Sequence, residues 1–309
     1  MLSQSELQDK LKIRHLTLFE AVCEQGSILK ASRSVGLSQP TVSKTIREME
    51  GVLGSALFRR TNRGVELTVF GTHVSVHTKR LLSHLRFMSD DLNTLQDASR
   101  GHVTVGTLIS ASAKLLPRSI IRLKQQSPNV IVTIREGSNE ILMPALANGE
   151  LDIVVGRIPD GPSYPGVIHQ PLYTESICAV VGTHHALATA AEVRLGDVQA
   201  SPWILPLADS QVRGAVEEIF AASQVDLPTD VVESFSILNN IAMLIESETI
   251  AVMPRAAADY YVAAGLLCIL PLEGTGRFGQ VGLTTSESYE LSPAAQRMEQ
   301  CLIEVAAQL

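Results

Sequence analysis

The apolar residues between positions 16 and 60 recur at the spacing of an α-helix, in three short segments. Gly36 separates the second segment from the third and supplies a turn. Ser38 occupies the position of a helix N-cap, and Pro40 lies in the first turn, where its missing N–H costs nothing. The pattern predicts two short helices, a turn and a third helix. Their predicted core consists of Leu16, Phe19, Val22, Ile28, Ala31, Val42, Ile46, Met49 and Leu53.

The opposite face of the third predicted helix is polar and suits the major groove of DNA. Glutamine can pair bidentately with adenine, lysine and arginine can reach guanine edges or phosphates, and a helix N-terminus can donate to a phosphate. A polar stripe is also the ordinary solvated face of a helix, and on this helix alone both interpretations stay open. The residues of the face are Gln39, Thr41, Ser43, Lys44 and Arg47.

The segment that follows favours DNA binding. Leu57 and Phe58 form an apolar anchor, and Arg59, Arg60 and Arg63 surround a turn directly after it. This shape suits a contact with the phosphate backbone beside the groove. Together with the polar helix face, it indicates a helix-turn-helix DNA-binding domain.

Charge is divided unevenly along the chain. Residues 1–100 contain 14 Lys and Arg against 10 Asp and Glu, whereas residues 101–309 contain 11 against 22. Because DNA repels an acidic surface, only the N-terminal part is a credible DNA-binding module. Its net charge of +4 is modest, which implies that a single copy binds weakly.

Residues from Phe70 to about Asp97 predict one long helix, because they contain no proline and a glycine only near the start. An apolar stripe of this length needs a partner. The partner is either the same helix of a second copy or the helix's own domain, and we favour the second copy because pairing would strengthen DNA binding. The stripe consists of Val74, Leu81, Leu85, Met88, Leu92 and Leu95.

After Arg100 the pattern changes to short strands that alternate with helices, which indicates a parallel sheet with crossover helices. We expect two α/β lobes, because the alternation occurs in two blocks. The cleft between such lobes is the usual place for a small ligand. Strands are predicted at 102–107, 130–136, 151–156, 176–182, 203–205, 231–234, 250–253 and 281–285, and helices at 113–126, 140–148, 213–222, 237–247 and 293–308.

The segment from Ser27 to Gly71, SILKASRSVGLSQPTVSKTIREMEGVLGSALFRRTNRGVELTVFG, resembles the LysR-type transcriptional regulators, and a looser likeness covers the rest of the chain. The resemblance implies an all-α winged helix-turn-helix domain at 1–69 and a linker helix for dimerisation at 70–100. A two-lobed α/β domain similar to periplasmic binding proteins would follow at 101–309. Lobe I would comprise 101–171 and 273–309, lobe II would comprise 174–270, and the hinge would lie near Pro171–Thr174 and Ile269–Glu273.

The resemblance also implies partners. The family's DNA-contacting positions match Gln39, Pro40, Ser43, Lys44 and Arg63. Two antiparallel linker helices would set two recognition helices against the half-sites of double-stranded DNA, and the dimers would pair into tetramers. The ligand would be a small organic, often anionic co-inducer. RNA polymerase is a further candidate partner.

The candidate ligand contacts lie in the predicted cleft. Ser110 lies near backbone N–H groups able to hold an anion, and the resemblance matches both Ser110 and Ser138 to co-inducer positions. On the second lobe we add Trp203, Ser210 and Ser236. Each serine has an alternative role as a helix N-cap, and the commoner role of a single tryptophan is in a core.

Two further features of the α/β part bear on the cleft. Arg157 directly follows a predicted strand. Its side chain could face the cleft as an anion partner or lie in solvent, and a solvated arginine is the commoner case. Glu248 and Thr249 stand where members of the family usually have glycine before a strand. This difference puts in doubt a detailed transfer of the family's second-lobe pocket to this chain.

The sequence favours a regulator over an enzyme. The eight histidines form no pattern typical of a catalytic base or a metal site, His184-His185 is an isolated pair, and neither GxGxxG nor a P-loop occurs. We therefore expect no cofactor and no metal. A solute-binding protein of a transport system is also disfavoured, for want of an export signal.

The remaining sequence signals concern location and redox chemistry. No run of eighteen apolar residues occurs, so we expect a cytoplasmic protein with no membrane partner. Four cysteines, Cys23, Cys178, Cys268 and Cys301, lie far apart with no CxxC spacing. This spacing disfavours structural zinc, a disulfide framework and oxidant sensing through paired cysteines.

Overall fold

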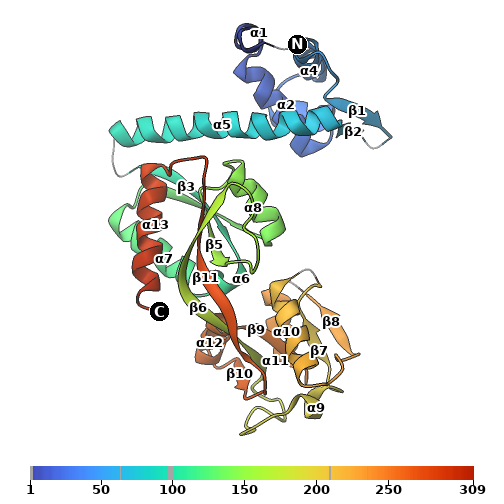
Figure 1. Ribbon diagram of the computed structural model, residues 1–309, viewed down its shortest axis with the longest axis vertical. Helices are drawn as coiled ribbons and strands as arrows, with labels where there is room; N and C mark the ends of the chain where they lie inside the picture. The colour runs from blue at the N-terminus through green and yellow to red at the C-terminus, as the bar shows by residue number, and fades with distance from the viewer. Residues whose placement is uncertain (1–2, 63, 97–99, 209, 235) are drawn as a thin grey trace. The chain divides into compact units, whose positions relative to one another are not determined.

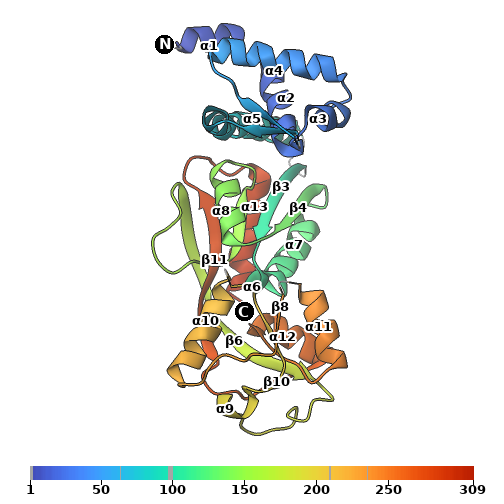
Figure 2. The ribbon, with the colours of Figure 1, turned by 90° about the vertical axis from the view of Figure 1, so that its right-hand side faces the viewer.

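The computed structural model describes residues 3–62, 64–96, 100–208, 210–234 and 236–309. The chain divides into two compact units, Met1–Leu95 with Asn148–Glu150, and Gln96–Ala147 with Leu151–Leu309 (Figures 1 and 2). Each unit has hydrophobic cores of its own. Within the described residues, no helix is long and apolar enough to cross a membrane.

The N-terminal unit contains the three predicted helices, which are confirmed as α2, α3 and α4. An additional helix, α1, precedes them, which the polar composition of residues 1–10 did not indicate. It forms because Ser3 and Glu6 cap each other's backbone N–H groups, and it buries no side chain. The elements are α1 (Gln4–Lys10), α2 (Ile13–Gln25), α3 (Ile28–Ser34), α4 (Gln39–Leu53), β1 (Phe58–Thr61), β2 (Gly64–Leu67) and α5 (Val69–Gln96).

The predicted apolar stripes form the core of this unit. Eight of the nine predicted core residues are buried, and the ninth, Ile28, is half-buried. Helix α4 begins after Ser38, whose Oγ accepts a hydrogen bond from the N–H of Thr41 at 3.4 Å. It ends at Gly54, whose φ of +72° suits the left-handed cap of a helix.

The long helix α5 confirms the predicted linker helix, and its apolar stripe divides into two parts. Val74 packs onto the core of the N-terminal unit. In contrast, Leu81, Met88 and Leu92 are 49%, 55% and 53% exposed. The side chain of Leu95 lies outside the described residues. These exposed apolar side chains on one helix are typical of a surface that packs against a partner.

The C-terminal unit alternates strands and helices as predicted. Its elements are β3 (Gly101–Thr107), α6 (Ile109–Ser112), α7 (Leu115–Gln126), β4 (Val130–Glu136), α8 (Asn139–Ala147), β5 (Ile153–Arg157), β6 (Val167–Gly182), α9 (Leu195–Val198), β7 (Trp203–Leu205), α10 (Gln211–Ala222), β8 (Val231–Glu233), α11 (Ile237–Glu246), β9 (Ile250–Pro254), α12 (Arg255–Ala263), β10 (Leu267–Leu270), β11 (Gly276–Ser286) and α13 (Pro293–Ala306).

One sheet runs through both lobes of this unit, in the order β4-β3-β5-β11-β6-β9-β7-β8, with β10 paired to β6. The pairs of β3 with β4 and β5 are parallel, as are those of β7 with β8 and β9. The prediction of a parallel sheet is therefore confirmed for these pairs. It was wrong for strands β6 and β11, which pair antiparallel with their neighbours and with each other. Figure 2 shows these two strands running together from one lobe to the other.

The lobes meet where β6 and β11 leave one core and enter the other. Tyr173 packs on the core of lobe I and Ile177 belongs to that of lobe II. On β11, Phe278 belongs to the core of lobe II and Val281 to that of lobe I. The second crossing therefore follows Phe278, later in the chain than the expected Ile269–Glu273. Helix α13 packs beside α7 on lobe I (Figure 1).

Four elements of this unit were not predicted, namely α6, α9, α12 and β10. Helix α12 starts directly after Pro254 and has alanines where an amphipathic pattern would show a clear apolar stripe. Strand β6 begins at Val167 rather than at residue 176, because its first half pairs with β11. Several side chains of this half are exposed, so the apolar pattern did not reveal it. Short elements and a half-exposed strand give weak periodicity.

Candidate functional site

The polar residues of α4 occupy the exposed face opposite the core. Gln39, Pro40, Lys44 and Arg47 are exposed, whereas Thr41 and Ser43 are half-buried. Gln39 and Pro40 form the first turn of the helix, directly after the capping Ser38. The first-turn N–H groups of a helix are free to bind an anion such as a phosphate.

Two of the basic side chains make weak contacts along the helix itself. Lys44 Nζ lies 3.7 Å from a carboxylate oxygen of Glu48, and both side chains are at least half exposed. Arg47 Nε donates to the carbonyl oxygen of Ser43 at 3.3 Å. Pairs of this kind contribute little to stability, so both cations can exchange these partners for DNA.

Strands β1 and β2 form a hairpin, the wing. Arg60 is opposite Val65 in the antiparallel register and its side chain is exposed. Arg59 forms an ion pair with Glu66 across the hairpin, with Nη2 2.9 Å from the carboxylate oxygen. Arg63, the remaining arginine predicted to contact DNA, lies outside the described residues.

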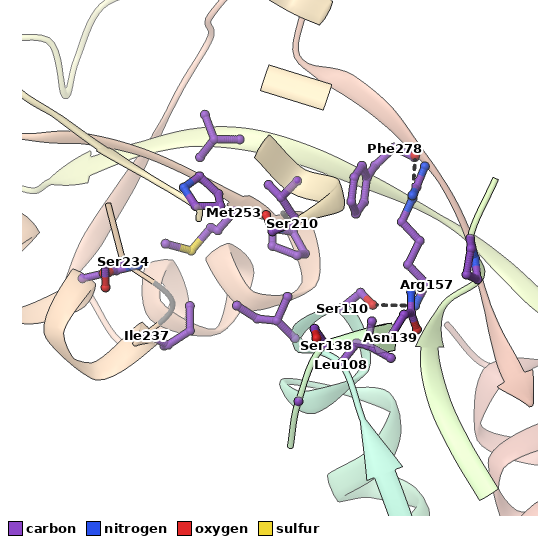
Figure 3. Close-up of a pocket in the computed structure, with 18 of the residues that line it drawn as sticks. Leu108, Ser110, Ser138, Asn139, Arg157, Ser210, Ser234, Ile237, Met253 and Phe278 are labelled. Atoms are coloured by element: carbon purple, nitrogen blue, oxygen red, sulfur yellow. Dashed lines mark hydrogen bonds between the residues drawn. The ribbon is translucent and has the colours of Figure 1, made fainter. Parts of the chain in front are cut away.

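A cavity of about 260 Å³ lies between the two lobes of the C-terminal unit (Figure 3). Lobe I contributes the loop after β3, the start of α8 and the end of β5. Lobe II contributes the starts of α10 and α11 and the end of β9. The described lining residues are Leu108, Ile109, Ser110, Gly137, Ser138, Asn139, Glu140, Arg157, Pro159, Pro206, Ser210, Val212, Ser234, Ile237, Asn240, Val252, Met253, Pro254 and Phe278.

Arg157 is the only cation among the described lining residues, and its side chain is 10% exposed. Its Nε donates to the carbonyl oxygen of Phe278 at 3.0 Å, and its guanidinium carbon lies 4.2 Å from the centre of the Phe278 ring. Its Nη2 pairs with Asp160, whose side chain is 83% exposed. The expectation of a solvated Arg157 side chain was therefore wrong, because the ring and the backbone of Phe278 hold the guanidinium in place (Figure 3).

Ser110 and Arg157 are connected directly. The Oγ of Ser110 accepts a hydrogen bond from the backbone N–H of Arg157 at 2.9 Å, and Ser110 is 1% exposed. This contact ties the loop after β3 to the end of β5. Ser110 therefore lines the cavity, as expected, and also positions Arg157.

Helices α8, α10 and α11 begin at the cavity. Ser138 precedes α8, and its carbonyl oxygen accepts hydrogen bonds from Ile141 and Leu142. Ser210 caps α10 through a 3.1 Å hydrogen bond from the N–H of Arg213 to its Oγ. Both serines line the cavity as expected, and each lies at the N-terminus of a helix. The positive ends of the three helix dipoles therefore meet there.

Two candidate ligand residues do not line the cavity, and the structure corrects them. Trp203 is 0% exposed, packs against Phe220 in the core of lobe II, and donates its indole N–H to the carbonyl oxygen of Val198 at 2.9 Å. Ser236 is exposed, and its Oγ caps α11 through the N–H of Asn239. Trp203 is therefore a core residue, and Ser236 is a helix N-cap.

The sequence interpretation missed five polar or aromatic residues of the cavity, namely Asn139, Glu140, Ser234, Asn240 and Phe278. The amide oxygens of Asn139 and Asn240 are buried and have no hydrogen-bond partner within the described residues. Their positions in the sequence could have indicated that they line the cavity. Asn139 directly follows Ser138, and Asn240 lies one helical turn after Ile237, the first residue of α11. Nothing in the sequence around Phe278 indicated that β11 reaches the cavity.

Glu248 and Thr249, the residues that depart from the family pattern, are not among the described lining residues. Glu248 accepts a hydrogen bond from the N–H of Ala186 at 3.3 Å, and one of its oxygens lies 3.5 Å from His185 Nε2. The pair His184-His185 thus has a carboxylate neighbour, which the sequence spacing did not indicate. Within the described residues, however, no group of three or more His, Cys, Asp or Glu could hold a metal ion.

All four cysteines are free thiols. Burial raises the pKa of both Cys23 and Cys178 to about 12, and it also raises the pKa of Cys301. Because the thiolate is the reactive form, these three thiols are poorly suited to react with oxidants.

Comparison with known proteins connects both sites to one family. Residues 13–72 match the family described as "Bacterial regulatory helix-turn-helix protein, lysR family", and residues 96–307 match the "LysR substrate binding domain". The chain is 30% identical to the HTH-type transcriptional regulator GbpR of Azospirillum brasilense, over 94% of this chain and 85% of that protein. It is 31% identical to the regulator GalR of Pseudomonas putida, over 98% of this chain and 76% of that protein.

A solved structure supports the same fold. The crystal structure of CbnR, a LysR family transcriptional regulator, superposes with a TM-score of 0.69 at 17% identity and covers 96% of this chain and 100% of that chain. The relatives are transcriptional regulators rather than enzymes. With a reader helix, a wing, a linker helix and a two-lobed ligand domain in this order, the chain belongs to the LysR family of bacterial transcriptional regulators.

Proposed function

We propose that this regulator reads its operator with the N-terminal half of α4 and grips the phosphate backbone with the wing. The exposed position of the α4 polar face and the weak partners of its cations support this assignment. CbnR has been solved as a complex with its target DNA. The proposed contact residues are Gln39, Pro40, Thr41, Ser43, Lys44, Arg47, Arg60 and Arg63.

The proposed co-inducer is a small organic anion that binds in the cavity between the lobes. The observation that carries this proposal is the buried guanidinium of Arg157 at the cavity where α8, α10 and α11 begin. A cation and three positive helix ends stabilise negative charge in the same small space. Since the cavity is also lined by many apolar side chains, the ligand would carry an apolar body.

Asp160 supplies a negative charge to Arg157. Because its carboxylate is mostly in water, its pair with Arg157 is inexpensive to break. A ligand carboxylate would take its place on Nη2, and Asp160 would return to solvent. Ser138, Ser210, Asn139 and Asn240 would then contact the remaining polar groups of the ligand.

The test compares carboxylates with neutral amides of the same shape. Benzoate, cyclohexanecarboxylate and hexanoate would be titrated into the full chain beside benzamide, cyclohexanecarboxamide and hexanamide, with thermal unfolding as the readout. We expect at least one carboxylate to raise the unfolding temperature, whereas its amide does not. Equal shifts within every pair, or no shift with any carboxylate, would count against an anion site at Arg157.

The regulator forms homo-oligomers, and we propose two surfaces for its self-contacts. The exposed stripe of α5 would pair with the same helix of a second copy. In the C-terminal unit, the edge strands β4 and β8 and their neighbouring helices expose apolar side chains, which a further copy would cover by placing lobe I against lobe II. These side chains are Ile121, Ile131, Ile134, Val232, Leu238 and Ile245, which are 39–79% exposed.

The two self-contacts can be separated by mutation. Ile121→Glu or Leu238→Glu would reduce a tetramer to a dimer, whereas the α5 contact would survive, and sedimentation equilibrium would measure both. Retention of tetramers by both variants would remove the lobe surfaces from the proposal.

We place the protein in the cytoplasm, where a bacterial operator and RNA polymerase are found.

A further inference from the structure

The recognition helix, the wing and the linker helix meet at a cluster of polar contacts that contains none of the proposed DNA-contacting residues. Its first member is Glu50, which is half-buried in the last turn of α4. Its Oε1 accepts a hydrogen bond from the N–H of Leu57 at 2.8 Å and a longer one from that of Phe58 at 3.5 Å. The carboxylate therefore holds the first strand of the wing against the end of the recognition helix.

Thr68 connects the same segment to the linker helix. Its Oγ1 donates to the carbonyl oxygen of Ala56 at 2.8 Å and accepts from the N–H of Gly71 at 2.9 Å, while its own N–H donates to the carbonyl oxygen of Leu57 at 2.9 Å. Gly71 lies in the first turn of α5, where a Cβ would be 2.1 Å from the carbonyl oxygen of Leu57. The start of α5 is thus packed directly on the chain that Glu50 holds.

A second contact fixes the other strand of the wing. The N–H of Val65 donates to the carbonyl oxygen of Gly26, in the turn between α2 and α3, at 3.0 Å. A Cβ on Gly64 would lie 2.3 Å from that oxygen, so only glycine allows this approach. Both strands of the wing are therefore fixed to the helices, and the hairpin cannot tilt without breaking hydrogen bonds.

We propose that Glu50 and Thr68 are positioning residues that hold α4, the wing and the start of α5 in one fixed arrangement, and thereby set the spacing between half-sites that the dimer accepts. The inference rests on the proposed operator reading by paired copies. In a dimer joined through α5, the distance between two recognition helices depends on the angle between α5 and α4. Base reading within one half-site depends only on the exposed face of α4.

The experiment measures spacing preference separately from base preference. An operator would be selected from random DNA with the full-length wild-type protein, and derivatives would be made with one, two or three base pairs inserted or removed between the half-sites. A second set would carry single base changes within one half-site. Affinities for both sets would be measured for the wild type, Glu50→Ala, Glu50→Gln and Thr68→Val, with Glu48→Ala as a control on an exposed carboxylate of the same helix.

We expect the wild type to prefer its own spacing strongly and Glu50→Ala to reduce that preference at least tenfold, because the N–H groups of Leu57 and Phe58 lose their acceptor. Discrimination within a half-site should change less than threefold. Thr68→Val should act in the same way, and Glu50→Gln, which keeps an acceptor oxygen, should restore most of the preference. Glu48→Ala should keep the wild-type spacing preference, whatever its overall affinity.

Several outcomes would overturn the inference. A wild-type spacing preference in both Glu50→Ala and Thr68→Val would show that the cluster does not set the geometry. If Glu50→Ala does not fold, Thr68→Val decides the question by the same ratio. A wild-type protein that selects no paired half-sites would contradict the proposed operator reading instead, which distinguishes the two failures.

Discussion

The recognition face of α4 and the cavity between the lobes use polar side chains in opposite ways. On α4, Lys44 and Arg47 are exposed and pair with groups of their own helix that they can leave at little cost. At the cavity, Ser110 and Arg157 are buried, and Arg157 is already bound to both Ser110 and Phe278. With the proposed contacts, DNA would therefore meet adaptable side chains, whereas a ligand would meet groups whose positions are set in advance.

The difference reflects what each partner supplies. DNA is long and offers many phosphates, so a few mobile cations on a paired protein suffice for affinity. A small ligand offers few groups, and each must find its partner without a further cost of ordering side chains. The comparison thus predicts which substitutions act broadly and which act at one site.

The largest effect should come from the linker helix, because pairing multiplies DNA contacts but not ligand contacts. Leu92→Glu would place a carboxylate in an apolar seam, where it loses hydration without gaining a partner. We expect dissociation to monomers and at least a hundredfold loss of operator affinity, measured by sedimentation and gel shift. Leu92→Met should keep the dimer, since it nearly conserves volume. An unchanged oligomer in Leu92→Glu would show that α5 packs within its own chain.

The next largest effect concerns Arg157. Arg157→Gln would remove the cation but keep one donor, and should weaken binding of an anionic co-inducer by about 1.5–3 kcal/mol, the contribution of a hydrogen bond to a charged group. Operator affinity without ligand should stay at the wild-type level. Glu140→Gln, at an exposed lining carboxylate, should strengthen anion binding slightly. Calorimetry measures both, and equal affinity in Arg157→Gln and wild type would place the anion elsewhere.

Substitutions of the proposed DNA-contacting residues should have effects similar to or smaller than that of Arg157→Gln. Gln39→Ala should weaken operator binding by about 1–3 kcal/mol and leave binding to random DNA unchanged. Arg60→Ala should instead weaken binding to every sequence and lower the salt slope by about one unit. Fluorescence titration at several salt concentrations separates the two. A sequence-selective loss in Arg60→Ala would mean that the wing reads bases.

The two sites also differ in how far the sequence could predict them. The reader was predictable because Gln39 to Arg47 are contiguous on one helix, so periodicity alone separates the core face from the exposed face. Ser110, Ser138 and Ser210 were found because each lies at the end of a strand or the start of a helix, where cleft residues gather.

The remaining cavity residues could not be predicted, because the cavity depends on contacts distant in sequence. Phe278 meets Arg157 only because β11 crosses between lobes and bonds with β5 and β6. Trp203 and Ser236 were misplaced for a related reason. Residue type and element position do not reveal whether a side chain points into a core, into solvent or into a cavity.

A buried carboxylate in the N-terminal unit should make stability depend on pH. Burial raises the pKa of Glu20 to about 6 from its ordinary value of 4.5, although Lys79 lies 3.8 Å away. The folded state therefore binds the proton more tightly than the unfolded state, and this stabilisation is present below pH 4.5 and lost as pH rises through 6. Glu20→Gln should stabilise the unit by up to about 2 kcal/mol at pH 7.5. Urea unfolding at pH 4 and pH 7.5 tests this, and equal gains at both would contradict it.

The smallest expected effect distinguishes a serine that contacts ligand from one that only caps a helix. Ser138 lines the cavity at the start of α8, whereas Ser236 caps α11 outside it. Ser138→Ala should weaken co-inducer binding by about 0.5–1.5 kcal/mol through the loss of one hydrogen bond. Ser236→Ala should leave ligand affinity unchanged and lower stability by about 1 kcal/mol, as expected for a lost N-cap. Calorimetry and urea unfolding of both full-length variants measure the two quantities. Equal ligand affinity in both variants would reduce Ser138 to a capping role and leave the ligand to Arg157 and the asparagines.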